Sequence, residues 1–570
     1  MRCWIVLLTL YMAAAVAAQP EADLIMLGGQ FRTPTGWAQA VAIKRGVLVA
    51  VGDPAAVNAY KGGATRTIDL HGATVLPGLH DMHVHPMLAG QTQLQCTFAQ
   101  GSSLQKILDA LKACVAKHAK GEWIVGGQWD AASLGGAPDR RSLDTVSPDN
   151  PVALTDISLH GLWVNSKALQ LAGIGADTKN PPGGVIERRA SGEPTGVLRE
   201  SAGGLVRSVI PPYTPEQNAK ALAWSLQTML SFGITSFTDA LADDSSLQAY
   251  ATLSDQGVLK QRVRACLAWS RSLLGGAEHG AFDYIALRNL YARERFHPDC
   301  IKILLDGVPT DGHTAAMLEP YADVKDPSDV RARGILMVPA NVLNRTVTEL
   351  DARGFVVKMH AAGDAAVHAG LDAIAATRKA NGFSGQLHEV AHNSFVSMSD
   401  IRRARDIMAT FEMSPYIWYP NPIIPDIVKA VGPERMKRWT PVKDAIDSGA
   451  LVVPGSDWAV VPSVNPWIAI ETLVTRQKPG GGGEALGESE RISLEQAIDL
   501  FTVNSARETG DRTRLGTIEP GMLADLIVVD RNPFKIPVTQ VHETTVTMTM
   551  INGEVVYRRA GGDAATGQEP

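Results

Sequence analysis

The chain is 570 residues long, which at about 150 residues per domain predicts two to four structural units, or one large α/β barrel with additions. Hydrophobic residues make up 45% of it and charged residues 20%, which excludes wholesale disorder and allows a large core. The net charge of −6 argues against a nucleic-acid scaffold, which normally carries an excess of basic residues.

Residues 1–18 read MRCWIVLLTLYMAAAVAA and have the parts of a secretory signal peptide: a basic start at Arg2, an apolar stretch and small residues at the end. We expect cleavage after Ala17 or Ala18 and export, to the bacterial periplasm. The alternative is an uncleaved membrane anchor, but the apolar stretch is short for a span of about 20 residues.

Four cysteines remain once Cys3 is removed with the signal: Cys96, Cys114, Cys266 and Cys300. They form no C-x-x-C pair, so a thiolate metal cluster is not expected. Export permits disulfides, and Cys96 and Cys114 are the pair closest in sequence. Four separately buried thiols are an equal alternative.

Residues 19–76 contain short apolar runs separated by Gly-rich turns, which predict the first part of a β-sandwich. The next stretch, PGLHDMHVHP over 77–86, ends an apolar strand. Residues two apart on a strand face the same side, so His83 and His85 should point together and can bind one divalent metal ion. His80 falls off this alternation and is expected to be structural.

Residues from about 96 to 225 break the alternation of strands and helices with Gly- and Pro-rich stretches, and we interpret them as an insertion over a barrel mouth. Lys302 follows, inside the apolar run CIKILLDG. Burial would lower the pKa of its amine and let it take up CO₂, giving a carbamate that bridges two metal ions. The alternative is an ordinary lysine that pairs with Asp306 or reaches the rim.

Three further candidates stand at the ends of apolar runs: His360 after FVVKM, His392 after QLHEVA and Asp457 after LVVPGS. His360 and His392 are 32 residues apart, close to one βα unit, and His392 and Asp457 are 65 apart, close to two. The spacing fits strands 5, 6 and 8 of a barrel whose strand 1 carries His83. Barrel enzymes place their chemistry at such strand ends.

The last part of the chain returns to β structure. A strand is expected over 523–530, and an Asn552-Gly553 turn predicts a hairpin over 546–557. The whole is predicted as an α/β fold: a (β/α)₈ TIM barrel over 77–505, and a composite β-sandwich of 19–76 and 506–560. Residues 561–570 are expected to be a disordered tail.

These motifs together resemble the amidohydrolase superfamily, and within it the family 3 (YtcJ-like) metal-dependent hydrolases. The matching stretches run in order from residue 21 to 558 and include PGLHDMHVHP, KILLDG, HAAGDAAV, PGSDWAV and LGTIEPGMLADLIVVD. The resemblance implies a TIM barrel with a composite sandwich. One departure is Ala391, where the family usually has Glu before the strand-6 His.

The resemblance also implies a ligand set. His83 and His85 match ligands of the more buried metal, and His360 and His392 match ligands of the second. Lys302 matches the carboxylated lysine that bridges two metals, and Asp457 matches the catalytic Asp at the metal site. His388, earlier in its strand, is a less favoured ligand.

The hypothesis for the mechanism is hydrolysis of a C–N bond in an amide, cyclic amide or N-formyl group. Two divalent ions, with zinc favoured by the imidazole-rich set, bridge a hydroxide, and Asp457 acts as general base. His160, in the insertion, is a candidate catalytic group that stabilises the developing oxyanion or binds substrate. Trp129, Trp163 and His313 are further candidates for substrate binding; the alternative for the insertion residues is core packing.

Two other functions stay open. One is a mononuclear deaminase on the same scaffold, which the presence of Lys302 disfavours. The other is a catalytically silent exported binding protein, which would not need the metal ligands and Asp457. The expected partner is a small-molecule substrate, with no nucleic acid and no stable membrane span after signal cleavage; a homodimer stays open.

Overall fold

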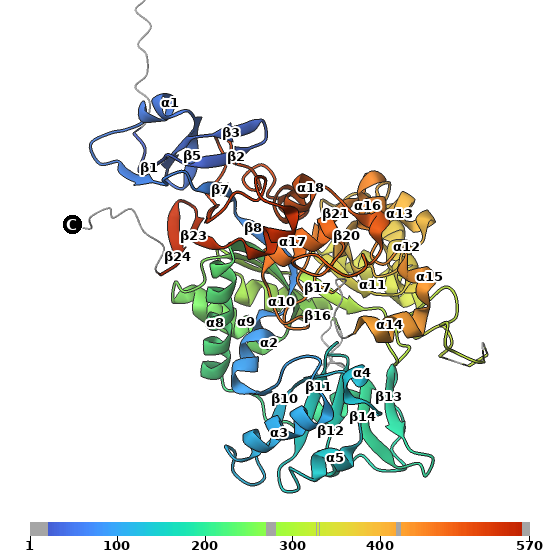
Figure 1. Ribbon diagram of the computed structural model, residues 1–570. Helices are drawn as coiled ribbons and strands as arrows, with labels where there is room; N and C mark the ends of the chain where they lie inside the picture. The colour runs from blue at the N-terminus through green and yellow to red at the C-terminus, as the bar shows by residue number, and fades with distance from the viewer. Residues whose placement is uncertain (1–20, 270–280, 327, 330, 418–422, 561–570) are drawn as a thin grey trace, which may run out of the picture.

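The structure is a computed structural model that describes residues 21–269, 281–326, 328–329, 331–417 and 423–560. The predicted signal peptide and the predicted C-terminal tail lie outside these residues. Three parts follow one another in space: a β-sandwich at one end, a barrel in the middle and the inserted unit at the other end (Figure 1).

The barrel is an eight-stranded parallel sheet in the order β21-β20-β19-β18-β17-β16-β15-β8. Its strands are β8 (Leu79–Val84), β15 (Ile234–Ala242), β16 (Arg262–Ala268), β17 (Phe296–Leu304), β18 (Val356–Ala361), β19 (Glu389–His392), β20 (Thr410–Met413) and β21 (Leu451–Pro454). Asp457 N–H donates to the His83 carbonyl at 2.7 Å and joins the last strand to the first. The predicted α/β barrel is confirmed.

Helices surround the barrel because parallel strands can only be joined by crossovers that pack on the outer face. They are α2 (Pro86–Gln91), α8 (Pro215–Ser231), α9 (Asp244–Asp255), α10 (Ala281–Tyr291), α11 (Ala340–Ala352), α12 (Asp364–Asn381), α13 (Met398–Ala404), α14 (Ile424–Val431), α15 (Pro433–Met436), α16 (Val442–Asp447), α17 (Pro466–Thr475), α18 (Leu494–Asp499) and α19 (Ser505–Glu508). Buried apolar residues of strands and helices form one continuous core.

The inserted unit has its own six-stranded sheet, in the order β13-β14-β12-β11-β10-β9. Its elements are β9 (Cys96–Thr97), α3 (Leu104–Val115), β10 (Ile124–Trp129), α4 (Ala131–Leu134), α5 (Arg140–Asp144), β11 (Val152–Asp156), β12 (Gly161–Val164), α6 (Ser166–Leu171), β13 (Gly184–Arg188), β14 (Pro194–Glu200) and α7 (Ala202–Arg207). It ends before α8, earlier than the predicted residue 225, because Thr214 and Gln217 form a capping box that starts this barrel helix.

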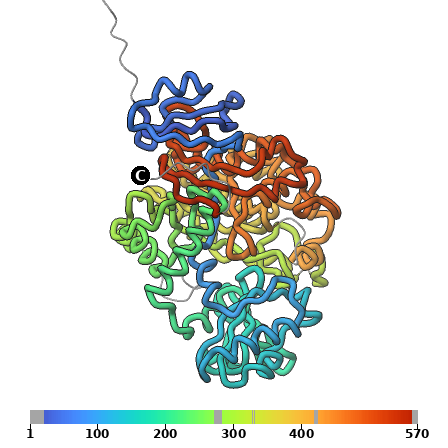
Figure 2. The backbone as a smooth tube through the Cα atoms, turned by 60° about the vertical axis from the view of Figure 1, so that its left-hand side comes forward, coloured from blue at the N-terminus to red at the C-terminus, as the bar shows by residue number. Residues whose placement is uncertain are grey.

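The sandwich joins both ends of the chain. One sheet, β5-β4-β1-β6, is N-terminal, and the other, β24-β23-β22-β7-β2-β3, is composite. The strands are β1 (Leu24–Leu27), β2 (Gln30–Thr33), β3 (Gly36–Ala38), β4 (Ala40–Lys44), β5 (Val47–Gly52), β6 (Arg66–Asp69), β7 (Thr74–Pro77), β22 (Leu526–Val529), β23 (Val546–Ile551) and β24 (Glu554–Arg558), with helix α1 (Pro54–Asn58). Figure 2 shows the two chain ends side by side, as the antiparallel pairing of β7 with β22 requires.

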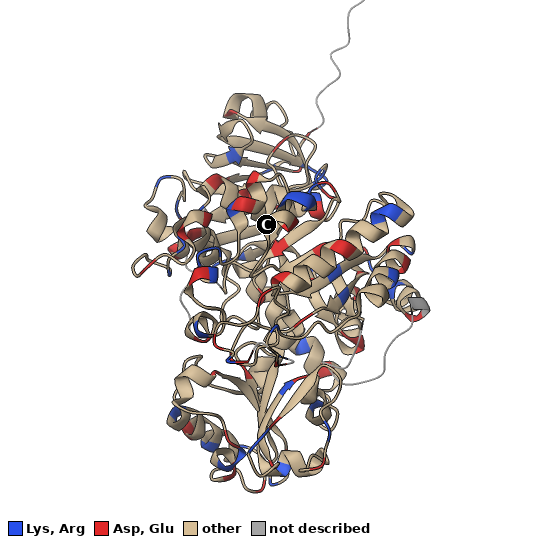
Figure 3. Cartoon of the chain, turned by 90° about the vertical axis from the view of Figure 1, so that its right-hand side faces the viewer, with Lys and Arg blue, Asp and Glu red and all other residues tan. Residues whose placement is uncertain are grey.

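Two disulfides are present among the described residues. Cys96–Cys114 ties β9 to α3, and Cys266–Cys300 ties the neighbouring barrel strands β16 and β17. The sequence left four separate thiols open, and the structure pairs Cys96 with Cys114 and Cys266 with Cys300. No helix among the described residues is long and apolar enough to cross a membrane. Basic and acidic residues are interspersed over the face shown in Figure 3.

Candidate metal centre

Six predicted site residues meet at the carboxyl ends of the barrel strands. His83 belongs to β8 and His85 follows it directly; the others are Lys302 on β17, His360 on β18, His392 on β19 and Asp457 after β21. Each is less than a tenth exposed, and all six line one cavity of about 1160 Å³ between the barrel and the inserted unit. The structure therefore brings together every residue of the predicted ligand set.

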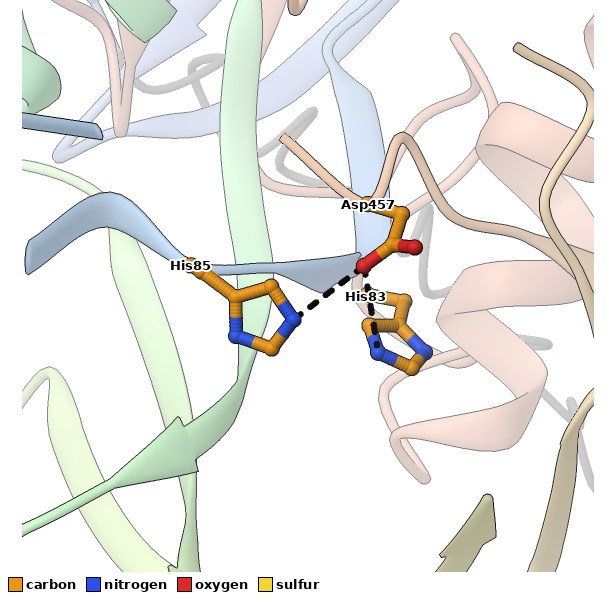
Figure 4. A group of neighbouring side chains, drawn as sticks. All are labelled: His83, His85 and Asp457. Atoms are coloured by element: carbon orange, nitrogen blue, oxygen red, sulfur yellow. Dashed lines mark hydrogen bonds and ion pairs between the residues drawn. The ribbon is translucent and has the colours of Figure 1, made fainter. Parts of the chain in front are cut away.

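Asp457 is the centre of the first group, drawn in Figure 4. Its Oδ1 lies 3.1 Å from His85 Nε2 and 3.7 Å from His83 Nε2. Lys302 Nζ lies 3.2 Å from the same His83 nitrogen. The side chains of His83, His85, Lys302 and Asp457 thus point toward one another.

Asp457 reaches this position because the chain turns sharply after β21. Asp457 has a φ of 58°, a left-handed conformation that Asp tolerates better than most residues. Gly455 precedes the turn, and a Cβ at that position would lie 2.3 Å from the Cβ of His83. The segment PGSD therefore passes so close to β8 that only glycine fits.

The second group of imidazoles stands beside the first. The ring centroids of His360 and His392 are 4.5 Å apart, and those of His83 and His392 are also 4.5 Å apart. His392 has a φ of 74°, which turns its side chain out of the strand toward the other rings. On the far side, His360 Nε2 lies 3.0 Å from the Gly307 carbonyl.

Burial sets the protonation state of these groups. It lowers the pKa of His83, His360 and His392 well below 6.5, and neighbouring cationic groups add to the effect. Burial, and then the charge of Lys358, lowers the pKa of Lys302 to about 7. Neutral imidazoles and a neutral amine offer lone pairs, which is the form that binds a metal or reacts with CO₂.

The residues present fit a metal centre. Two groups bring one ligand atom from each member within 4.8 Å of one another: His83, His85 and Asp457, and His83, His392 and Glu412. Buried imidazoles and carboxylates are typical ligands of zinc and related divalent ions. His85 Nδ1 is buried without a hydrogen-bond partner among the described residues.

Comparison with known proteins agrees with this geometry. The sequence model of the amidohydrolase family matches residues 66–557, which is most of the chain. A Bacillus subtilis (strain 168) protein named "Putative amidohydrolase YtcJ" is 30% identical over 92% of this chain and 96% of its own length. The chain belongs to the amidohydrolase family.

Other relatives of this amidohydrolase carry different names. The N-substituted formamide deformylase of Arthrobacter pascens is 27% identical over 95% of this chain and 99% of its own length. A metal-dependent hydrolase structure from Pyrococcus horikoshii OT3 has the same fold. It matches with a TM-score of 0.70 at 23% identity, over 90% of this chain and 99% of that one.

His160 of the amidohydrolase reaches the cavity, as predicted. It stands at the start of β12, and its ring centroid is 5.1 Å from that of His360. Its Nδ1 lies 2.7 Å from Glu200 Oε2, and Glu200 Oε1 accepts a hydrogen bond from the Thr314 hydroxyl. Burial lowers the pKa of His160, but the carboxylates of Glu200, Asp156 and Asp457 together raise it, so the net shift is upward.

The other predicted substrate contacts need correction. Trp129 and Trp163 do not line the cavity: they are at most 1% exposed and meet edge to face in the core of the inserted unit. His313 lies off the cavity too, with Nε2 2.9 Å from Asp323 and its ring against Tyr321. Large indoles suit a core as well as a pocket, and the sequence carries no signal that separates the two.

His80, expected to be structural, and His388, the less favoured ligand, have other surroundings than the six candidate ligands. His388 Nε2 contacts Asp351 at 3.0 Å, and His80 is buried with its pKa lowered to about 4 by burial. Asp306 accepts hydrogen bonds from the backbone N–H groups of Ala316, Ala362 and Gly363. Asp306 is therefore engaged with these loops, and Lys302 faces His83 instead.

Sequence reasoning missed Glu412, the fully buried carboxylate of β20. Its Oε2 lies 2.6 Å from His83 Nδ1. In register it stands opposite Ala391, the position where the sequence lacks the expected Glu, so a neighbouring strand supplies a carboxylate there. The available signal was a lone Glu inside the apolar run TFEM, which is the same signal that marked Lys302.

Proposed function

We propose that this amidohydrolase hydrolyses the C–N bond of a small amide, cyclic amide or N-formyl compound with two divalent metal ions, most suitably zinc. The observation that carries the proposal is the meeting of four histidines, Lys302 and Asp457 in one cavity. The name of the Arthrobacter relative, a deformylase of N-substituted formamides, supports an N-formyl or N-acyl substrate.

In this proposal His83 and His85 would hold one ion, His360 and His392 would hold the other, and a carbamate on Lys302 would be a ligand for both. The neutral amine of Lys302, 3.2 Å from His83 Nε2, supports the bridging role. When bound, the ions would supply Lewis-acid activation of the substrate carbonyl and of the attacking water.

Asp457 accepts the proton of the attacking water at Oδ1 or Oδ2 and later delivers it to the leaving nitrogen. The positions of both oxygens support this role: Oδ1 is 3.1 Å from His85 and Oδ2 is 3.9 Å from His392, so the carboxylate lies between the two groups of imidazoles. His160, with its raised pKa, donates a hydrogen bond to the carbonyl oxygen as negative charge develops there.

The rest of the cavity wall supports a substrate with an apolar substituent. The volume of the cavity, about 1160 Å³, exceeds what a formyl or acetyl group needs. Apolar side chains dominate the wall away from the metal ligands, among them Leu88, Phe98, Ile427, Trp439 and Val460. The candidate metal ligands lie at the barrel end, where the reacting bond would lie, and polar side chains of the inserted unit, among them Gln100, Gln128 and Arg207, also line the wall.

The first experiment is elemental analysis of the purified protein, wild type against Lys302→Ala. We expect about two metal equivalents in the wild type and one or fewer in the variant, because the bridging ligand is lost. One equivalent in both proteins would favour a mononuclear deaminase. No metal in either would favour a silent binding protein.

The second experiment is a substrate screen on the metal-loaded wild type. Formamides with apolar N-substituents, N-acyl amines and cyclic amides are tested, and released amine or formate is measured. Turnover of N-substituted formamides or amides supports the proposal. Ammonia release from amino-heterocycles, with no amide turned over, would contradict it in favour of deamination.

We also propose export to the periplasm, on the signal-like composition of residues 1–18. The two disulfides support an oxidising compartment. N-terminal sequencing of the protein from a periplasmic fraction should find a start at residue 18 or 19. An intact Met1 in the cytoplasmic fraction would contradict export.

A further inference from the structure

Strand β20 supplies none of the predicted ligands, yet Glu412 on it contacts His83 and Ser414, directly after it, contacts His392. Glu412 and Ser414 are two residues apart in extended chain, so their side chains point to the same side at the end of β20. Glu412 is fully buried and Ser414 is 4% exposed. Neither has a part in the mechanism proposed above.

Glu412 acts on the first group. Its Oε2 lies 2.6 Å from His83 Nδ1, a separation that two atoms reach when they share a proton and that is too short for two ligands of one metal ion. The other ring nitrogen, Nε2, faces Lys302 Nζ at 3.2 Å, where an amine hydrogen meets its lone pair. When Glu412 is ionised it can only accept, and His83 then carries its proton on Nδ1 and donates it to Glu412.

Ser414 links the Glu412 carboxylate to the second group of imidazoles. Its hydroxyl donates to Glu412 Oε1 at 3.2 Å, and its oxygen lies 3.1 Å from His392 Nδ1. A hydroxyl has a single hydrogen, and a carboxylate only accepts. With that hydrogen given to Glu412, Ser414 accepts from His392, which then carries its proton on Nδ1 as well.

We propose that Glu412 and Ser414 are positioning residues of this enzyme: together they hold His83 and His392 as Nδ1–H tautomers and leave both Nε2 atoms free for the two metal ions. The proposal rests on the metal assignment of the proposed function. One carboxylate thereby orients a ligand of each ion, directly for His83 and through one hydroxyl for His392.

The test measures the affinity of each metal equivalent by chelator competition with Zn²⁺, together with the melting temperature. Ser414→Ala removes the contact with His392 and the hydrogen bond to Glu412 Oε1, but it leaves Glu412 Oε2 on His83 Nδ1. One equivalent should therefore weaken by about 10–100-fold while the other stays within about threefold. Glu412→Gln keeps the shape and an acceptor but loses the charge, so the equivalent at His83 should weaken as well.

Thr410→Val is the matched control. Thr410 is on the same strand, two residues before Glu412, and is fully buried; its hydroxyl has no hydrogen-bond partner among the described residues. This change removes a hydroxyl without touching the imidazoles, and both equivalents should bind as in the wild type. Ser414→Thr, which retains a hydroxyl, should restore most of the affinity that Ser414→Ala loses.

The outcomes separate this inference from the proposed function. A wild type that binds no metal contradicts the proposed function itself. A wild type that binds two ions, with Ser414→Ala binding both as tightly, overturns the positioning role. Equal weakening of both equivalents with a lowered melting temperature would also overturn it, because that pattern reports general damage to the barrel.

Discussion

Asp457 offers a clean test of proton transfer, because its backbone constrains which residues can replace it. At a φ of 58° Asn is among the few residues tolerated, so Asp457→Asn should keep the turn and the contacts to β8. The amide cannot take the proton of the attacking water, so we expect kcat to fall by about 10²–10⁴-fold.

Metal content, measured by elemental analysis, should stay close to that of the wild type, since the histidines and Lys302 are unchanged. Steady-state kinetics on the best amide from the screen gives kcat. Activity within tenfold of the wild type, with metal bound, would remove Asp457 from the role of general base. Asp457→Ala is the less informative variant because it also loses the contact with His85.

Lys302 makes carbamate formation depend on pH. Only the neutral amine reacts with CO₂, and burial places the pKa of Lys302 at about 7 instead of its usual 10.5. In metal-free protein about a tenth of the amine is neutral at pH 6 and most of it at pH 8.5. Carbamate formation should therefore rise as pH increases through about 7.

The ¹³C NMR signal of the carbamate, formed from ¹³C-bicarbonate in metal-free protein, measures this rise. Lys302→Ala should give no such signal at either pH and so serves as the control for other amines. Equal signals from the wild type at pH 6 and 8.5 would mean that burial does not lower the pKa of the Lys302 amine.

The inserted unit contacts the loop that carries Asp457 through two amides of its own. Gln128, at the end of β10, donates to the Ala459 carbonyl at 2.5 Å, and Gln100 donates to the Val460 carbonyl at 3.0 Å. Gln100 also donates to the Gln128 side chain at 2.6 Å. The loop that carries Asp457 is thus supported from outside the barrel.

Gln128→Ala removes this support and leaves every proposed metal ligand in place. The loss of one or two hydrogen bonds, each worth about 1 kcal/mol net, predicts a fall in kcat/KM of about 5–30-fold. Kinetics and metal analysis on the same preparation check it. Unchanged kinetics, or loss of metal along with activity, would contradict a role limited to positioning the loop.

The disulfide Cys96–Cys114 links β9 to α3 at the start of the inserted unit. It closes a loop of 18 residues, for which chain entropy in the unfolded state predicts a stabilisation of about 3 kcal/mol. Replacing both cysteines by serine should lower the free energy of unfolding of this unit by that amount. Urea unfolding followed by the fluorescence of Trp129 and Trp163 measures it, and unchanged unfolding would contradict this stabilisation.

The success of sequence reasoning differed between these elements for physical reasons. The run VVKMH is buried throughout in β18, and a fully buried parallel strand leaves such a nearly continuous apolar pattern. Trp129 and Trp163 were misplaced because burial in a core and in a pocket select the same residue type. Glu412 was missed because its partner, His83, is 329 residues away, and only the barrel closure brings them together.

At the scale of the whole molecule, the sandwich and the candidate metal centre share one continuous segment. Strand β7 pairs with β22 along its whole length, and after Gly78 the same chain continues as β8, which carries His83. Arg262 of β16 reaches across to Asp525 and Asn552, which flank the C-terminal strands. The C-terminal strands therefore stabilise β7, which leads into the barrel, and their flanking residues pair with the partly buried charge of Arg262.

Truncation after residue 524 should expose the edge of β7 and leave Arg262 without these two partners. An unpaired strand edge promotes aggregation, and loss of a buried ion pair typically costs about 3–5 kcal/mol. We expect little soluble protein, and less than half of the wild-type metal content in whatever stays soluble. A chain ending at residue 560 keeps β22 to β24 and should match the wild type. If the shorter truncation folds and binds metal normally, the barrel does not depend on the composite sheet.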